Sequence, residues 1–278
     1  MVWHNGQLVH ASEVRLSPFD QGLTIGLGAF ETLIAIGTEP FAFSRHWQRL
    51  QYSCRQLQLP LPDRTTVHEA LREVTAANNH VGGRLRVTVT PGAGPPGAGR
   101  ATTSPPTYLV TTAPRPVWPA TARVITLPWP RNEHSPLSGI KSTSYAECSL
   151  GLAHARHHGA DEAVFPNTQG HLCEGTSSNV FVVENNGLVT PPLSDGCLGG
   201  VTRALVIELA TTLGIPVRES SIPIADWPHA TEAFLTSSTR NIQPISRIDS
   251  TALPQAPGPL TAQLISQWHD RQAVIIDP

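Results

Sequence analysis

The sequence contains almost no lysine. Of its 278 residues, 19 are Lys or Arg, and Lys141 is the single lysine. Lysine is normally among the commonest residues, so nearly every surface cation here is an arginine. Arginine stays charged at any accessible pH, whereas a desolvated lysine loses its proton and its amine can attack a carbonyl to form a Schiff base. Lys141 is therefore a candidate nucleophile, although a last unreplaced surface lysine would give the same count.

Other absences exclude whole classes of protein. The formal net charge of −2 gives no basic footprint for nucleic acid. No apolar run approaches the roughly 20 residues of a membrane span, and the N-terminus lacks the charged and apolar regions of a secretory signal. The four cysteines, with no CxxC among them, are predicted to be reduced thiols. We expect a cytoplasmic protein with no nucleic-acid or membrane partner.

The length suits two ordinary domains. Residues 1–113 are predicted to form a small α/β domain. A proline-rich stretch at 114–120 is typical of a stiff linker. Residues 121–278 are denser in predicted strands and are expected to form a larger α+β domain that carries Lys141. The Pro- and Gly-rich segment 91–106 is predicted to be a mobile loop.

Several turns and helix ends are predicted from local patterns. Asn5-Gly6 and Asn185-Asn186-Gly187 are hairpin turn signals. Ser44 is expected to cap a helix that ends near Leu57. Ser144-Tyr145-Ala146-Glu147 has the form of a capping box that opens a helix over 145–158, with Gly159 at its C′ position. Lys141 then lies just before a helix start, where its side chain can point into a cleft.

Four further features suggest chemistry, and each has a plainer alternative. Glu174 precedes a hydroxyl-rich turn and can point into a cleft or merely cap turn amides. Gly199-Gly200-Val201-Thr202 opens a helix and suits an anion, although it can be a simple glycine turn. Thr236-Ser237-Ser238-Thr239 can hold phosphate or be a polar loop. Arg49, in the first predicted helix, can bind such an anion or be solvated.

Together these features suggest pyridoxal 5′-phosphate. That cofactor requires a Schiff-base lysine, a partner for its pyridine nitrogen and a phosphate cup. The sequence then resembles the class IV aminotransferases, the fold type IV pyridoxal-phosphate enzymes. The likeness covers almost the whole chain and rests on Asp20-Gln21-Gly22, Gly26-Leu27-Gly28-Ala29-Phe30-Glu31-Thr32, His46-Trp47-Gln48-Arg49-Leu50, Gly139-Ile140-Lys141, Glu174-Gly175-Thr176-Ser177-Ser178-Asn179-Val180-Phe181, Gly200-Val201-Thr202-Arg203 and Phe234-Leu235-Thr236-Ser237-Ser238.

The resemblance implies a two-domain α/β (α+β) fold like that of D-amino acid aminotransferase, with the cofactor between the domains and usually a homodimer. It implies that Lys141 forms the Schiff base and shuttles the proton, and that Glu174 pairs with the pyridinium nitrogen. Tyr145 is expected near the ring hydroxyl, and Phe30 in the substrate pocket. The phosphate is expected to contact Arg49, Val201, Thr202 and Ser238. Leu27 departs from many lyase and D-amino acid aminotransferase members, which carry aspartate there.

The residues in these motifs are most similar to those of 4-amino-4-deoxychorismate lyases, which release pyruvate and 4-aminobenzoate for folate synthesis. The substrate would be a small-molecule amine. A D-amino acid or branched-chain aminotransferase would use the same residues and a keto-acid acceptor, and remains the alternative. Substrate carboxylates need cations, for which Arg86 and Arg240 are candidates, although each can instead be structural.

Other classes explain less of the sequence. A cofactor-free Schiff-base lyase leaves the anion sites without a purpose. A metal site could include His154, His157 and His158, which lie at helical spacing. No carboxylate or cysteine completes such a ligand set, so we expect no metal. A serine hydrolase lacks its Gly-x-Ser-x-Gly motif. A non-catalytic binding module would keep the fold without chemistry, yet every matched cofactor position is present.

Overall fold

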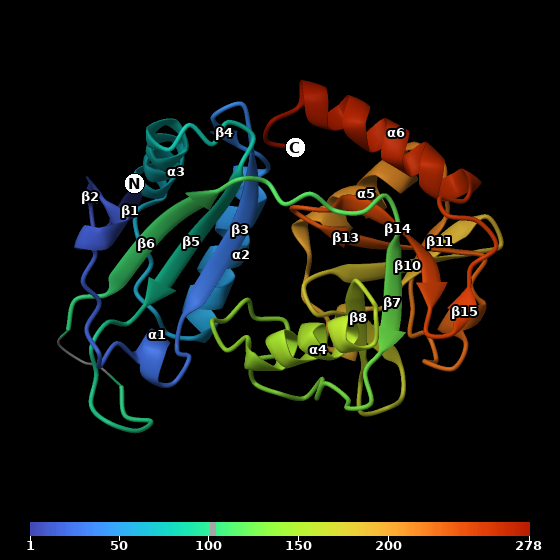
Figure 1. The fold of residues 1–278 in the computed structure, drawn as a ribbon, viewed down its shortest axis with the longest axis horizontal. Helices are drawn as coiled ribbons and strands as arrows, with labels where there is room; N and C mark the ends of the chain where they lie inside the picture. Colours follow the sequence, from blue (N-terminus) through green and yellow to red (C-terminus); the bar gives the residue numbers. More distant parts are fainter. Residues whose placement is uncertain (101–103) are drawn as a thin grey trace. The chain divides into compact units, whose positions relative to one another are not determined.

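The computed structural model describes residues 1–100 and 104–278, so residues 101–103 of the predicted loop lie outside the described residues. The chain divides into two compact units. The first unit comprises Met1–Pro116, Ile140–Tyr145 and Ile276–Pro278, and the second comprises Val117–Gly139 and Ala146–Ile275. Both mix helices with sheet, as the predicted α/β (α+β) class requires (Figure 1).

The first unit is built on a six-stranded sheet in the order β2-β1-β6-β5-β3-β4, and every pair in it is antiparallel. Asn5 and Gly6 have φ of 45° and 96°, which confirms the predicted tight turn between β1 and β2. The strands are β1 (Val2–His4), β2 (Gln7–Val9), β3 (Ala29–Ile36), β4 (Glu39–Pro40), β5 (Arg84–Thr90) and β6 (Thr107–Ala113). The helices are η1 (Ala11–Glu13), α1 (Gln21–Thr24), α2 (Phe43–Gln56) and α3 (Arg64–Ala77).

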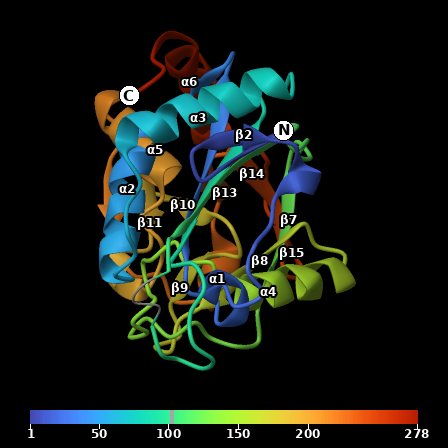
Figure 2. The same cartoon turned by 90° about the vertical axis from the view of Figure 1, so that its left-hand side faces the viewer.

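The two faces of this sheet differ in character. Side chains alternate along a strand, so Leu85, Val87 and Val89 of β5 join the hydrophobic core with residues of α2 and α3. Arg84, Arg86 and Thr88 point to the other face of the same strand. Figure 2 shows α2 and α3 crossing each other steeply. One face of the sheet is thus apolar and helix-covered, and the other carries cations and hydroxyls.

Helix α2 starts two residues earlier than predicted, so the expectation that Ser44 caps it is wrong. Its N-cap is Ala42, which has φ of 54° and makes no side-chain cap. That left-handed turn brings Phe43 into the helix and the core, leaving Ser44 inside the first turn. The Ser44 amide donates instead to the Asp277 carboxylate, at 2.9 Å. A residue 233 positions away therefore supplies the cap.

The second unit is built on a nine-stranded sheet with the order β12-β11-β10-β13-β14-β7-β8-β9, and β15 pairs with β14. Three neighbouring pairs are parallel, namely β11/β12, β14/β7 and β7/β8. Asn185 and Asn186, at φ of 49° and 61°, confirm the predicted turn between β10 and β11. The strands are β7 (Ala122–Thr126), β8 (Glu162–Pro166), β9 (Leu172–Gly175), β10 (Asn179–Glu184), β11 (Gly187–Thr190), β12 (Val217–Glu219), β13 (Glu232–Ser237), β14 (Asn241–Ile248) and β15 (Thr251–Ala252).

The helices of the second unit pack on different parts of its sheet. Helix α4 (Ala146–His157) lies against β8 around Phe165 and Ala155, while α5 (Val201–Thr212) and α6 (Pro259–Val274) lie together beside β13 and β14 (Figure 1). Short helices η2 (Leu193–Asp195) and η3 (Trp227–His229) complete the unit. None of the helices in residues 1–100 and 104–278 has the length and apolar character that a membrane crossing requires.

The segment that carries Lys141 packs with the first unit, although the sequence places it early in the predicted second domain. Backbone contacts explain this difference. Ser142 forms a β-bridge with Ala29, and the Phe30 amide donates to the Lys141 carbonyl at 3.0 Å. Lys141 is therefore held at the start of β3 by main-chain hydrogen bonds.

Candidate active site

Lys141, Phe30 and Tyr145 form one cluster in the first unit. The Lys141 ammonium lies 3.3 Å from the Tyr145 hydroxyl and 4.4 Å from the centre of the Phe30 ring. The Phe30 and Tyr145 rings meet edge to face, with centroids 4.9 Å apart. An amine against two aromatic rings is partly desolvated and attracted to their faces. The structure thus brings three residues predicted for the site into contact.

Arg86 extends this cluster. Its guanidinium carbon lies 3.8 Å from the centre of the Phe30 ring, and its Nε donates to Thr88 Oγ1 at 3.1 Å. The β3/β5 register, which pairs Phe30 with Thr88 and Thr32 with Arg86, puts these side chains on one face. Burial lowers the pKa of the Arg86 guanidinium, and a cation that has lost part of its hydration favours an anionic partner.

Leu27, the residue at which the chain departs from many relatives, packs against the hydrophobic core of the first unit. An aspartate side chain would bring a carboxylate to that apolar surface. The neighbouring glycine, Gly28, is tightly enclosed, because an added Cβ would lie 2.8 Å from Thr143 Oγ1. The segment before β3 is therefore fixed by packing.

Arg49 lies on α2, and two of its nitrogens are bound by a buried carboxylate. Its Nε and Nη2 each donate to one oxygen of Glu31, both at 2.8 Å. His46 Nδ1 lies 2.7 Å from the same carboxylate, whose residue is 1% exposed. Burial acts to raise the pKa of Glu31, but Arg49 and His46 outweigh it and hold that pKa well below its usual range. Glu31 therefore orients the Arg49 guanidinium.

Glu174, at the end of β9, is also buried with a counter-charge. It is 8% exposed, accepts from Arg131 Nη1, and accepts from the Leu198 amide at 3.0 Å. Arg131 also stacks on Phe165, with its guanidinium carbon 4.1 Å from the ring centre. Burial acts to lower the pKa of Arg131, but Glu174 outweighs it and raises that pKa above its usual range. Arg131 and the Leu198 amide thus orient the Glu174 carboxylate.

The N-terminus of α5 presents backbone amides. Its N-cap, Gly200, makes no side-chain cap, and Val201 and Thr202 are 7% and 5% exposed. A Cβ on Gly200 would collide with the Asn179 amide oxygen. Thr236, which pairs with Asn179 across β10 and β13, has a buried hydroxyl without a partner among the described residues. Uncapped amides and an unsatisfied hydroxyl are suited to an anion.

Ser238 and Arg240 lie in the turn between β13 and β14. Ser238 is half-buried, whereas Arg240 is 7% exposed. The Arg240 Nη2 donates to Glu162 at 2.8 Å and its Nη1 donates to Gln243 at 2.6 Å. The structure therefore places the predicted substrate cation Arg240 inside a buried network.

The predicted residues fall into two groups. The first unit brings together Phe30, Arg86, Lys141 and Tyr145, with Arg49 on α2. The second unit carries Glu174, the α5 start and the β13–β14 turn. The sequence interpretation missed the roles of Glu31, His46 and Arg131. Glu31 and His46 occur inside motifs that were recognised, whereas Arg131 follows a proline-rich stretch that has no distinguishing pattern.

The three histidines at the end of α4, His154, His157 and the following His158, show no metal geometry. Over residues 1–100 and 104–278, no group of three or more His, Cys, Asp or Glu side chains is placed to hold a metal ion. The rings of His154 and His158 instead contact each other, with centroids 4.3 Å apart. The four cysteines are free and buried.

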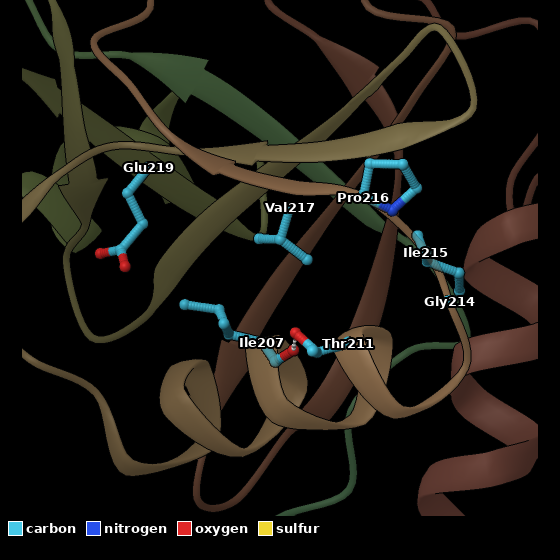
Figure 3. A pocket seen from close by; sticks show the side chains of 7 residues that line it. All are labelled: Ile207, Thr211, Gly214, Ile215, Pro216, Val217 and Glu219. Carbon is cyan, nitrogen blue, oxygen red and sulfur yellow. Dashed lines mark hydrogen bonds between the residues drawn. The ribbon is translucent and has the colours of Figure 1, made fainter.

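A cavity of about 450 Å³ lies between α5 and β12 (Figure 3). Its single carboxylate, Glu219, accepts from Arg203 at 2.6 Å, and the Thr211 hydroxyl donates to the carbonyl of Ile207. No lysine or uncapped helix start contributes to its lining, so it offers none of the chemistry found at the two residue groups. The lining residues are Ile207, Thr211, Gly214, Ile215, Pro216, Val217 and Glu219.

Comparison with known proteins gives one family match and several similar chains. The family described as amino-transferase class IV matches residues 28–248. A Methanocaldococcus jannaschii protein, provisionally named a branched-chain-amino-acid aminotransferase, is 31% identical over 97% of this chain and 95% of its own. The 4-amino-4-deoxychorismate lyase structure from Pseudomonas aeruginosa has a TM-score of 0.86 and 29% identity, over 97% of this chain and 98% of its own. The branched-chain aminotransferase from Thermobaculum terrenum in its PLP-form has a TM-score of 0.86 and 26% identity, over 97% and 92%.

Proposed function

This chain belongs to the amino-transferase class IV family, and we propose that within it the protein is a pyridoxal-phosphate-dependent 4-amino-4-deoxychorismate lyase. Lyases and aminotransferases both occur among its relatives at similar identity. The choice between them therefore depends on the residues around Lys141.

The residues fit the cofactor. When bound, pyridoxal phosphate withdraws electrons from the carbon that bears the substrate nitrogen. Lys141 Nζ would carry it covalently, and the Glu174 carboxylate, oriented by Arg131, would pair with its ring nitrogen. Its phosphate would be bound by the uncapped amides of Val201 and Thr202, by Ser238 and by Arg49. The buried unpartnered hydroxyl of Thr236 supports an anion at the α5 end of this set.

Lys141 would do the proton chemistry. Once the substrate amine had displaced it, the neutral Nζ would take the proton from the carbon that bears nitrogen. The bond between the ring carbon and the enolpyruvyl oxygen would then break, the departing enolpyruvate would take up that proton to become pyruvate, and the ring would become aromatic 4-aminobenzoate. Tyr145, 3.3 Å from Nζ, would orient the amine. No keto acid is needed.

The observation that carries this choice is the Arg86 guanidinium stacked on Phe30 beside Lys141. The lyase substrate has two carboxylates on a polar ring, whereas a branched-chain amino acid presents an aliphatic side chain. On the Lys141 face, β5 offers Arg84, Arg86 and Thr88. Such a surface favours a polar dianion over an aliphatic side chain.

A branched-chain or D-amino acid aminotransferase is the second candidate. The observation in its favour is the 31% identity to a protein provisionally named a branched-chain aminotransferase. This activity would use the same Lys141 and would return the proton to the cofactor, so it needs an amino acid together with a keto acid.

The deciding experiment supplies aminodeoxychorismate to the purified holoenzyme without any keto acid. We expect pyruvate and 4-aminobenzoate in equal amounts, and none from the Lys141→Ala variant. Arg86→Met should raise KM for this substrate at least about tenfold, because a charged hydrogen bond is worth about 1.5–3 kcal/mol. Turnover only with an amino acid and a keto acid would contradict the lyase proposal.

We also propose a cytoplasmic homodimer. Large apolar side chains are exposed around α1, with Phe19 at 59% and Leu23 at 71% exposure. An apolar patch of this kind supports a subunit interface. The four free cysteines are in keeping with a reducing compartment. Light scattering during gel filtration should give twice the mass of 29.9 kDa.

A further inference from the structure

A buried ion pair in the second unit has no role in the function proposed above. Glu162 begins β8 and is 0% exposed, while Arg240 follows β13 and is 7% exposed. Arg240 Nη2 donates to Glu162 Oε2 at 2.8 Å. Removing two charges from water is costly unless both are fully paired, so the remaining contacts of each residue show what the pair holds.

Glu162 holds the turn that follows Glu174. Its Oε1 accepts from the amide of Thr176, at 3.2 Å, and from the hydroxyl of the same residue. Its Oε2 lies 3.4 Å from the Ser177 hydroxyl and 3.3 Å from the Ser178 hydroxyl. One carboxylate therefore fixes three consecutive residues, of which the first stands two positions after Glu174.

Arg240 holds the other turn. Its amide donates to Ser237 Oγ at 3.3 Å, and its Nη1 donates to Gln243 at 2.6 Å. The guanidinium also stacks on the Trp118 ring, with its carbon 3.7 Å from the ring centre. These contacts fix the β13–β14 turn that contains Ser238.

We propose that Arg240 is a positioning residue that joins the Ser238 turn to the Glu174 turn through Glu162, and thereby fixes the spacing of the phosphate and ring-nitrogen contacts of the cofactor. The proposal rests on the cofactor roles given above for Ser238 and Glu174. It assigns Arg240 no contact with substrate. The planar guanidinium reaches Glu162 and Gln243 with two nitrogens while its face covers Trp118, which the single ammonium of a lysine does not do.

Cofactor binding measured without substrate tests this role. The holoenzyme is stripped of pyridoxal phosphate and titrated with it, and the Kd and the visible absorption maximum are recorded for wild type, Arg240→Gln and Arg240→Lys. In metal sites, loss of a residue that orients a ligating side chain typically costs about 10–100-fold in affinity, and we take that range for a residue that orients two cofactor contacts. We expect that loss in Arg240→Gln, with a displaced absorption maximum and partial recovery in Arg240→Lys.

The matched control is Arg218→Gln. Arg218 also donates to a glutamate at 2.8 Å, but its side chain is 60% exposed, so its removal should leave both readouts unchanged. The double variant Glu162→Gln/Arg240→Gln removes both buried charges together, which covers the case in which the single variant does not fold. It should fold and still bind pyridoxal phosphate at least about tenfold more weakly than wild type.

A substrate contact would give a different result. Wild-type Kd and absorption in Arg240→Gln, with a raised KM for the amine substrate, would overturn the proposal. Wild-type cofactor affinity in the double variant would overturn it as well. If the wild-type protein itself bound no pyridoxal phosphate, the function proposed above would fail, and that outcome is distinct from a variant-specific loss.

Discussion

The two units each bury an arginine–carboxylate pair at a predicted cofactor contact, with the roles reversed. In the first unit Arg49 is the predicted phosphate contact, and Glu31 binds two of its nitrogens. In the second unit Glu174 is the predicted ring-nitrogen contact, and Arg131 holds it. In the first unit the arginine is the predicted cofactor contact and the carboxylate orients it. In the second unit the carboxylate is the predicted contact and the arginine orients it.

This difference follows from the charges of the ligand. A phosphate needs a cation and a pyridinium needs an anion, and either group, once buried, needs a counter-charge to remain ionised. The two pairs are therefore expected to respond to mutation in different ways. The predictions below test this contrast from the largest effect to the smallest.

The largest loss of activity is expected from replacing Lys141, because neither arginine–carboxylate pair can supply its amine. Lys141→Ala should lower kcat/KM on the order of 10⁴-fold or more, because it removes both the covalent attachment and the general base. Lys141→Arg keeps the positive charge and should be equally inactive. Appreciable steady-state turnover by the arginine variant would show that charge, not the amine, is required.

The next largest effect is expected from breaking the Arg131–Glu174 pair of the second unit. Arg131→Met leaves Glu174 buried without its cation and should cost about 3–5 kcal/mol of unfolding free energy. It should also weaken pyridoxal phosphate binding, because Glu174 would lose the guanidinium that orients it. Urea unfolding of the cofactor-free protein measures the first effect. Arg218→Met, at an exposed ion pair, should cost at most about 1 kcal/mol.

The corresponding change in the first unit has a pH signature. Arg49 and His46 hold the pKa of Glu31 below its ordinary value of 4.5. The stabilisation that this carboxylate contributes is therefore complete above about pH 4.5 and decreases as the pH falls toward the folded-state pKa. Glu31→Gln should reduce stability near pH 7 and flatten the acid side of the stability curve. A variant with the wild-type slope between pH 5 and pH 3 would contradict this assignment.

These partners also mark the limit of the sequence interpretation. Local patterns and family motifs predict the fold class, the hairpin turns at Asn5-Gly6 and Asn185-Asn186, and the cluster of Lys141 with Tyr145 and Phe30. Arg131 is 43 positions from Glu174, so no local spacing indicates their contact. A buried counter-charge is determined by the tertiary structure, and one sequence does not reveal which of 18 arginines supplies it.

The N-cap of α2 is a second contact that the local sequence does not indicate. Its loss is expected to cost less unfolding free energy than the loss of a buried counter-charge. Asp277→Ala removes the acceptor of the Ser44 amide and should cost about 1 kcal/mol, a typical value for an N-cap. Asp63→Ala removes the local cap of α3, where the carboxylate accepts from Thr66 at 2.8 Å, and should cost about as much. Asp270→Ala, at an exposed position in α6, is the control. Equal stability of the Asp277 and Asp270 variants would rule out the distant cap.

The smallest response is expected from the cysteine thiols, which should not react with a thiol reagent in the native protein. Burial raises the pKa of Cys54 and of Cys197 to about 12, so at pH 8 almost none of either is thiolate. Thiolate is the reactive form. A thiol reagent should label none of the four cysteines in the native protein and all four in urea. Rapid native labelling would place at least one thiol at the surface.

Borohydride reduction of the holoenzyme tests the central claim most directly. Reduction fixes a covalently held pyridoxal phosphate to its amine, and peptide mapping by mass spectrometry locates it. The single lysine makes the expected result simple: one phosphopyridoxyl group on the peptide that contains Lys141. An unmodified Lys141 after saturation with the cofactor would contradict the account.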